Sequence, residues 1–319
     1  MKEALFVKQN SEKWKRYQQM HSENPDELAE RFIDITNDLA YANTFYPKSN
    51  TTAYLNGLAS VLHQSIYKNK KEDRNRFITF WKTELPVLFY TYRKQLLYSL
   101  FFFLLSASIG ALSAKYDDSF VRLILGDSYV NMTNENIAKG DPFGVYKRQG
   151  EVEMFLMIAA NNSYVALIMF VSGIFVSVGP VFFMLKNGVM IGAFEYYFFS
   201  KGLGAASILT IWIHGTLEIS AIIIAGAAGL VLGHGLLFPK TYTRFQAFKN
   251  SAKDGTKIAL GLIPIILLAA FFEGFITRHT EMPVALSISI LAGSLLFIIW
   301  YVILYPSKLH KRHQTIENV

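Results

Sequence analysis

Long apolar runs follow one another after residue 94, and no other feature of the sequence restricts the fold as strongly. A helix needs about 20 apolar residues to cross a hydrocarbon core about 30 Å thick. Helices also satisfy their own backbone hydrogen bonds in lipid, whereas an open sheet leaves an unpaired edge. The sequence therefore predicts an all-α fold, a polytopic helical membrane bundle. The long runs cover residues 95–114, 154–185, 206–237, 258–277 and 284–305.

A shorter apolar stretch, residues 189–199, decides how many times the chain crosses. It follows the polar Lys186-Asn187-Gly188 and contains Glu195, so it looks too short to span alone. The N-terminal region, the loop after residue 237 and the C-terminal tail are all basic, and basic segments stay on the cytoplasmic side. All three share a side only if the short stretch crosses. We therefore expect six spans, the third short, tilted or broken, with a five-span bundle containing a re-entrant segment as the alternative.

Charge and polarity divide the chain into three parts. Residues 1–94 are expected to form a cytoplasmic and interfacial helical region, residues 95–305 the bundle, and residues 306–319 a basic cytoplasmic tail. Residues 115–153 are polar and contain more acids than bases, which favours a loop outside the membrane. The sequence thus predicts a multi-pass protein with both termini in the cytoplasm.

The N-terminal region has the three- and four-residue apolar spacing of short packed helices. Helix starts are expected near Pro25-Asp26-Glu27 and near Ser49-Asn50-Thr51, which gives three or four helices. Residues 74–93 then mix aromatic and cationic side chains. That mixture is typical of a helix lying at the lipid headgroups, where both kinds of side chain find partners.

Composition excludes several classes of site. The chain contains no cysteine, so disulfides, thiolate metal sites and cysteine nucleophiles are ruled out. The formal net charge of +7 could indicate nucleic acid or anionic lipid as a partner, but in a membrane protein basic residues chiefly set orientation. We expect membrane lipids and no nucleic acid as partners. The common metalloprotease, serine-hydrolase and phosphate-loop motifs are absent, so we expect no enzyme, no catalytic residue and no cofactor.

Five polar side chains in the apolar segments need an explanation, because a charge at the centre of a span costs about 2.5–3.5 kcal/mol on insertion scales. They are His214, Glu218, Glu195, Glu273 and Asn187. His214 and Glu218 are four residues apart and share one helix face. This polar cluster is predicted either to be a clasp that fixes helix register or to be a site for a proton, an ion or a lipid headgroup.

A metal site on the same helix would combine His214 and Glu218 with His234, which follows them. Twenty residues of helix amount to a rotation of about 200° and a rise of about 30 Å, so His234 faces away from the pair. On this argument we expect no metal. The glycines of these segments are expected to permit close helix packing, and the Gly229-x-x-x-Gly233 pattern would also permit a homodimer. The packing glycines are Gly188, Gly192, Gly215, Gly226, Gly229 and Gly233.

Two segments carry a family resemblance. Lys186-Asn187-Gly188-Val-Met-Ile-Gly192, and Ile213-His214-Gly215-Thr-Leu-Glu218 with the glycine-rich run that follows, resemble the stage II sporulation protein M family of integral membrane proteins. The pre-membrane segment Asp38-Leu39-Ala40-Tyr41-Ala42 is similar too. Where the family usually has proline before the histidine, this chain has Ile213, and its outer loop is long.

The resemblance implies a component of cell-envelope remodelling in the bacterial cytoplasmic membrane. The name-giving member works with wall-degrading enzymes during engulfment and is not itself an enzyme, and many relatives occur in bacteria that make no spores. We therefore expect a non-catalytic scaffold with envelope protein partners. A transporter or channel for protons, ions or lipid groups is the alternative, and an intramembrane hydrolase is a third.

Overall fold

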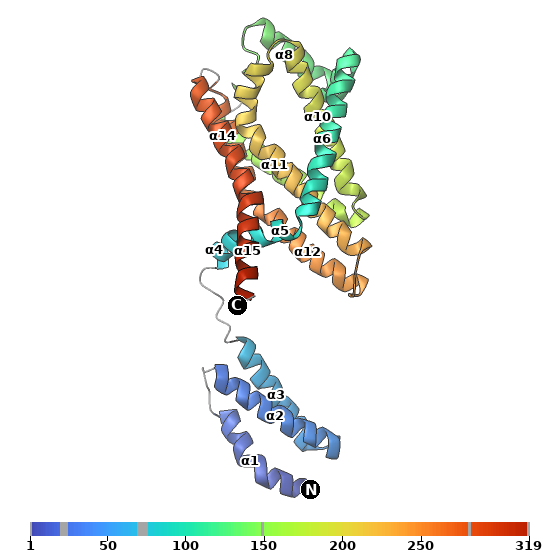
Figure 1. Cartoon of the computed structure of the whole chain (residues 1–319), viewed down its shortest axis with the longest axis vertical. Coiled ribbons are helices and arrows are strands. Elements are labelled where there is room, and N and C mark those ends of the chain that lie inside the picture. Colours follow the sequence, from blue (N-terminus) through green and yellow to red (C-terminus); the bar gives the residue numbers. More distant parts are fainter. Residues whose placement is uncertain (1, 20–24, 69–75, 148–149, 280–281, 318–319) are drawn as a thin grey trace. The chain divides into compact units, whose positions relative to one another are not determined.

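A computed structural model describes residues 2–19, 25–68, 76–147, 150–279 and 282–317, and within these ranges the chain is helical with no strand (Figure 1). The chain divides into two compact units, Met1–Arg76 and Phe77–Val319. The all-α fold expected from the sequence is thereby confirmed. Each unit is described by itself.

The first unit consists of three helices, α1 (Glu3–Gln19), α2 (Pro25–Phe45) and α3 (Asn50–Lys68). The two expected helix starts are confirmed, and at the second the Ser49 hydroxyl accepts from the Thr52 backbone N–H as an N-terminal cap. Polar bonds join the helices as well: Trp14 Nε1 donates to Asp38 Oδ2 at 2.7 Å, and Thr51 donates to Glu3. The unit has its own core, whose buried members are Phe6, Trp14, Leu28, Ile35, Ala42, Leu55, Leu58, Ala59 and Leu62.

The second unit contains five helices that are long and apolar enough to cross a membrane, which confirms the polytopic bundle. The most buried of them is α11 (Gly204–Leu237), with 67% of its apolar window inside the bundle against 11–44% for the other four. The glycine-lined α11 is therefore the central helix of the bundle. The other four are α6 (Arg93–Tyr116), α9 with its 3-10 turn η3 (151–175), the continuous helix 244–277, and the continuous helix 284–312.

The third apolar segment begins earlier than the sequence suggested. After α9 ends at Val171 and η3 at Phe175, Val176 and Ser177 adopt left-handed backbone angles (φ 55° and 69°), and α10 then runs unbroken over Val178–Ser200. The expected second span was therefore too long and the expected third too short. Gly173 and the Gly179-Pro180 pair flank the turn as local signals, but they lie inside one apolar run, from which a single span was expected. Lys186 was taken as a boundary, but it lies inside the helix.

Helix α10 is 23 residues long but is not among the five apolar helices, since Lys186 and Glu195 interrupt its hydrophobic sequence. It lies alongside α6 (Figure 1). The contact is close: an added Cβ at Gly110 of α6 would lie 2.3 Å from Val189 O, and one at Gly192 would lie 1.9 Å from Ala107 O. Packing along a crossing helix favours the six-span count, which remains a prediction.

Two segments that were expected to be loops are helical. The basic segment after residue 237 forms α12 (Arg244–Gly261), which continues through α13 (Ile263–Phe271) into the π-helical turn η4 (Phe272–Thr277). The acidic segment forms a helical cap made of α7 (Asp118–Leu125), α8 (Asp127–Ala138) and the 3-10 turn η2 (Gly144–Lys147). Asp117 caps α7 by accepting from the Ser119 N–H and hydroxyl, and these hydrogen bonds lower its pKa.

From Arg76 on, the segment expected at the headgroups is also helical, and from Phe77 it belongs to the second unit; residues 74 and 75 lie outside the described residues. It comprises α4 (Arg76–Thr79), the π-helical η1 (Phe80–Glu84) and α5 (Leu85–Thr91). Lys257 of α12 pairs with Glu84 at 2.6 Å, and Tyr92 donates to Asp254 at 2.7 Å. The last span is α14 (Val284–Ile299), η5 (Trp300–Leu304) and α15 (Tyr305–Glu317), and its Tyr301 hydroxyl donates to Trp81 O. The segment thus packs across one end of the bundle.

Candidate intramembrane polar site

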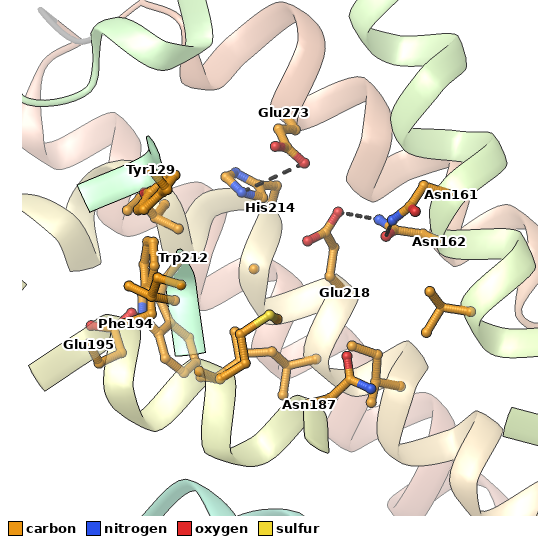
Figure 2. Close-up of a pocket in the computed structure, with 18 of the residues that line it drawn as sticks. Tyr129, Asn161, Asn162, Asn187, Phe194, Glu195, Trp212, His214, Glu218 and Glu273 are labelled. Atoms are coloured by element: carbon orange, nitrogen blue, oxygen red, sulfur yellow. Dashed lines mark hydrogen bonds and ion pairs between the residues drawn. The ribbon is translucent and has the colours of Figure 1, made fainter. Parts of the chain in front are cut away.

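A cavity of about 400 Å³ lies inside the second unit, between α11 and the elements around it. Figure 2 shows its labelled polar residues arranged around this space. They come from α8, α9, α10, α11 and η4, and the cap also contributes Tyr146 of η2. All five residues of the expected polar cluster line this one cavity. The complete polar lining is Tyr129, Tyr146, Asn161, Asn162, Asn187, Glu195, Trp212, His214, Glu218 and Glu273.

Three of the five converge. His214 and Glu218 project from one face of α11, and Glu273 reaches toward them from η4 (Figure 2). His214 Nε2 lies 3.8 Å from Glu273 Oε2, and one ligand-type atom from each of the three side chains lies within 4.8 Å of the others. Two charged carboxylates at that separation would repel each other by at least about 3 kcal/mol at an effective dielectric of 20. The two groups therefore hold either a shared proton or a cation between them.

The π-helical turn η4 determines where Glu273 points. A π-turn inserts one extra residue into a helix, changes the direction of the side chains on it, and often occurs at functional sites. The continuous helix 244–277 ends in this turn, and Glu273 is its second residue. From periodicity alone Glu273 could not be assigned to the face that meets α11.

The imidazole of His214 is fixed on its other side. The residue is only 3% exposed, and its Nδ1 lies 2.8 Å from Thr277 Oγ1. Thr277 Oγ1 in turn donates to Phe272 O at 3.1 Å. Because the single hydroxyl hydrogen is used in that bond, Thr277 accepts from Nδ1–H, so that Nε2 carries the lone pair that faces the carboxylates.

Asn162 of α9 holds the second carboxylate, since its Nδ2 donates to Glu218 Oε1 (Figure 2). Asn161 and Asn162 stand together in the second apolar run of the sequence. Two adjacent amides in an apolar run are a signal of a polar site, but the sequence does not show which residue they bond to. Thr277, Asn162 and Tyr146 were all missed as site residues, because each acts through a contact between helices far apart in sequence.

The cap reaches the same group of residues. The ring of Tyr146 meets the His214 ring edge to face, with centroids 5.8 Å apart. Burial and the neighbouring Glu273 carboxylate raise the pKa of Tyr146 well above its ordinary value, so the phenol stays neutral at physiological pH. The segment expected to be an outside loop therefore covers one side of the cavity.

Glu195 and Asn187 line the cavity without joining the convergent group. Glu195 accepts from Trp212 Nε1 at 2.7 Å, and the Ser207 hydroxyl lies 3.5 Å away, while Asn187 donates to Phe183 O of its own helix. Figure 2 shows both side chains set apart from His214. Each of these two polar groups has a local partner.

His234 and five of the six expected packing glycines are not among the residues that line the polar cavity. His234 borders a different cavity, together with residues such as Tyr92 and Pro239, so the expectation that it lies away from His214 is confirmed. Gly188, Gly192, Gly226, Gly229 and Gly233 each lie where an added Cβ would come within 3 Å of a neighbouring helix or turn. Gly215 differs, because nothing lies within 4 Å of a Cβ there and the residue borders the polar cavity.

Comparisons with known proteins agree with this architecture. Residues 99–278, more than half of the chain, match the family described as stage II sporulation protein M. Residues 4–68, nearly all of the first unit, match a family described as a domain of unknown function (DUF8413). No curated protein and no solved structure matches the chain. The match covers α6, α9, α10, α11 and the turn η4, and the chain belongs to the stage II sporulation protein M family.

Proposed function

We propose that this chain is a non-catalytic membrane scaffold of a cell-envelope complex in the bacterial cytoplasmic membrane. The observation that carries the proposal is the first unit, a compact helical domain with its own core joined to a membrane bundle. It also matches a separate domain family. A chain built in this way anchors a partner-binding domain at the membrane without needing chemistry of its own.

The proposed orientation places both termini in the cytoplasm. With α10 counted as a crossing, six crossings return the chain to the side on which it began. Support comes from the charge distribution, since α12 carries Arg244, Lys249 and Lys253, and α15, at the end of the last span, carries Lys308 and Arg312. Positive charge near span ends faces the cytoplasm.

The first unit offers a surface for a partner. A groove of about 430 Å³ runs between α1 and α3, bordered by Tyr17, Tyr54 and Val61. Gly57 opens it further, because nothing lies within 4 Å of a Cβ at that position. Val61 is 59% exposed in this groove, and large exposed apolar side chains beside a concavity favour a protein partner.

Val61→Glu in the full-length chain tests the proposal, with Ile33→Glu as the matched control on α2. Both residues are β-branched and equally exposed, at 59% and 58%, but Ile33 does not line the groove. The tagged protein is purified from its native membrane in mild detergent after brief cross-linking, and bound proteins are quantified by mass spectrometry. We expect a near-stoichiometric partner with the wild type and Ile33→Glu, and its loss with Val61→Glu. A wild type that purifies alone, or equal retention by both variants, contradicts the scaffold.

A transporter or channel is the second candidate, and the polar cavity inside the bundle favours it. Glu218→Gln removes one charge from the cavity, whereas Glu195→Gln changes a residue that keeps its own partner, Trp212. Proton, ion and lipid flux are measured with purified protein in liposomes. Flux that is abolished by Glu218→Gln and kept by Glu195→Gln would support transport, and no flux above that of empty liposomes would exclude it.

A further inference from the structure

We propose that His214, Glu218 and Glu273 bind one divalent transition-metal ion of the Zn²⁺, Fe²⁺ or Mn²⁺ class inside the bundle. The proposal goes beyond the scaffold function and does not depend on it. It also departs from the expectation that the chain holds no metal. That expectation considered ligands on one helix, and the third ligand comes instead from η4.

The convergent atoms carry lone pairs that face one another. His214 presents an unprotonated Nε2, since its Nδ1–H is donated to Thr277. Glu218 and Glu273 present carboxylate oxygens within 4.8 Å of that nitrogen and of each other. Among the described residues, the Asn162 amide donates to Glu218, and Glu218 and Glu273 are hydrogen-bonded to each other, so that a metal ion would displace the proton between them. His214 is 3% exposed and the Glu273 side chain 16%, and a buried group of acceptors of this kind is arranged for a cation.

The spacing suits a metal ion. Ligands about 2.1 Å from a tetrahedral zinc lie about 3.4 Å from one another. His214 Nε2 and Glu273 Oε2 are 3.8 Å apart, so a small side-chain movement brings them into coordination distance. Within the described ranges, the ion pair that Glu273 forms is the one with His214.

The supporting contacts are those of a metal site as well. Histidine ligands usually donate their second ring N–H to an oxygen, and ligating carboxylates accept a hydrogen bond of their own. Thr277 supplies the first contact and Asn162 the second. One nitrogen and two oxygens favour zinc, iron or manganese over calcium or magnesium. Three protein ligands would leave a fourth position open, and all three side chains line the cavity.

Metal counting on the full-length protein tests the site. The protein is purified in detergent, stripped with a chelator, loaded with Zn²⁺ or Mn²⁺ and desalted, and bound metal is measured by mass spectrometry. We expect one ion per chain for the wild type and for the control Glu195→Gln. We expect less than one-fifth of that for His214→Gln and for Glu273→Gln. Asn162→Ala should weaken zinc binding tenfold to a hundredfold in competition with a chromophoric chelator.

Folding is followed separately in each variant. Zinc should raise the thermal unfolding temperature of the wild type and Glu195→Gln, and should leave that of His214→Gln unchanged. If His214→Gln does not fold, the graded loss in Asn162→Ala decides the question. A wild type that retains no zinc or manganese overturns the proposal in favour of a proton shared by the two carboxylates, and retention by all variants places the metal elsewhere. Neither result affects the partner test with Val61→Glu.

Discussion

The two halves of α11 differ in what their small residues face. From Ile224 to Gly233 every residue is buried. At Gly226, Gly229 and Gly233, the space that a Cβ would take is filled by atoms of α6, α9, α10 or the turn between α9 and α10. In the preceding half, Gly215 stands between His214 and Glu218 and borders a cavity. Glycine therefore has two uses in this helix. In one half it lets backbones touch, and in the other its missing side chain leaves space beside a polar site.

The largest expected effect comes from exchanging these glycines for alanine. A Cβ at Gly229 would lie 2.5 Å from Met169 O, and a backbone atom cannot move aside as a side-chain end can. Gly229→Ala should therefore destabilise the bundle by about 2–3 kcal/mol. Gly215→Ala should be neutral or should stabilise it by up to about 1 kcal/mol, because alanine favours helix and space is free. Unfolding in detergent measures both, and equal effects would remove the distinction between the two halves.

The next prediction tests whether η4 holds in place the half of α11 that carries His214 and Glu218. Thr277→Val removes the partner of His214 Nδ1 and leaves a buried N–H unsatisfied, which should cost about 1–3 kcal/mol. Thr216→Val is the matched control, since that buried hydroxyl donates only to Trp212 O of its own helix. The control should change stability by less than about 0.5 kcal/mol. A similar loss in both variants would mean that the bond from His214 adds nothing.

A smaller effect is expected at the end of the bundle where α5 packs. Tyr92→Phe removes the hydrogen bond to Asp254 and should cost about 1 kcal/mol. Burial, followed by the Asp254 carboxylate, raises the pKa of Tyr92. The folded protein thus holds this proton more tightly than the unfolded chain, and the stabilisation is lost as pH rises above about 10. Wild type should lose stability more steeply than Tyr92→Phe in that range, and parallel curves would contradict the assignment.

The smallest effect is expected in the cap. The Ser119 hydroxyl and N–H lower the pKa of Asp117, so this residue stabilises α7 above the unfolded pKa of about 4 and the contribution is lost as pH falls below it. Asp117→Asn keeps an acceptor for the cap but removes the charge. Stability of the variant should be nearly unchanged at pH 7 and should fall less than that of wild type toward pH 3. A steeper fall in the variant would show that the charge is not stabilising.

Much of the architecture followed from the sequence because its cause is local. The length of an apolar run fixes whether a helix can cross, and spacing fixes which residues share a face, so the bundle, the central position of α11 and the His214–Glu218 pair were all predictable. The short helices of the first unit followed from capping residues at Pro25 and Ser49 for the same reason. The turn at Val176 and Ser177 lies within one long apolar run, so hydropathy missed the boundaries of α9 and α10 there, although Gly179-Pro180 begins two residues after Ser177.

Tertiary structure decided which polar residues meet. Sequence placed Glu195, Asn187 and Glu273 together with His214 and Glu218 by residue type alone, and the fold joined only Glu273 to the pair, through a π-turn that no periodicity reveals. It also brought Asn162, Thr277 and Tyr146 to the site from segments 52 to 68 residues away in sequence from His214. The sequence determines where charge must be buried in this bundle, because insertion depends on local composition. Which charges share one partner depends on how the helices pack, and that is a property of the folded chain.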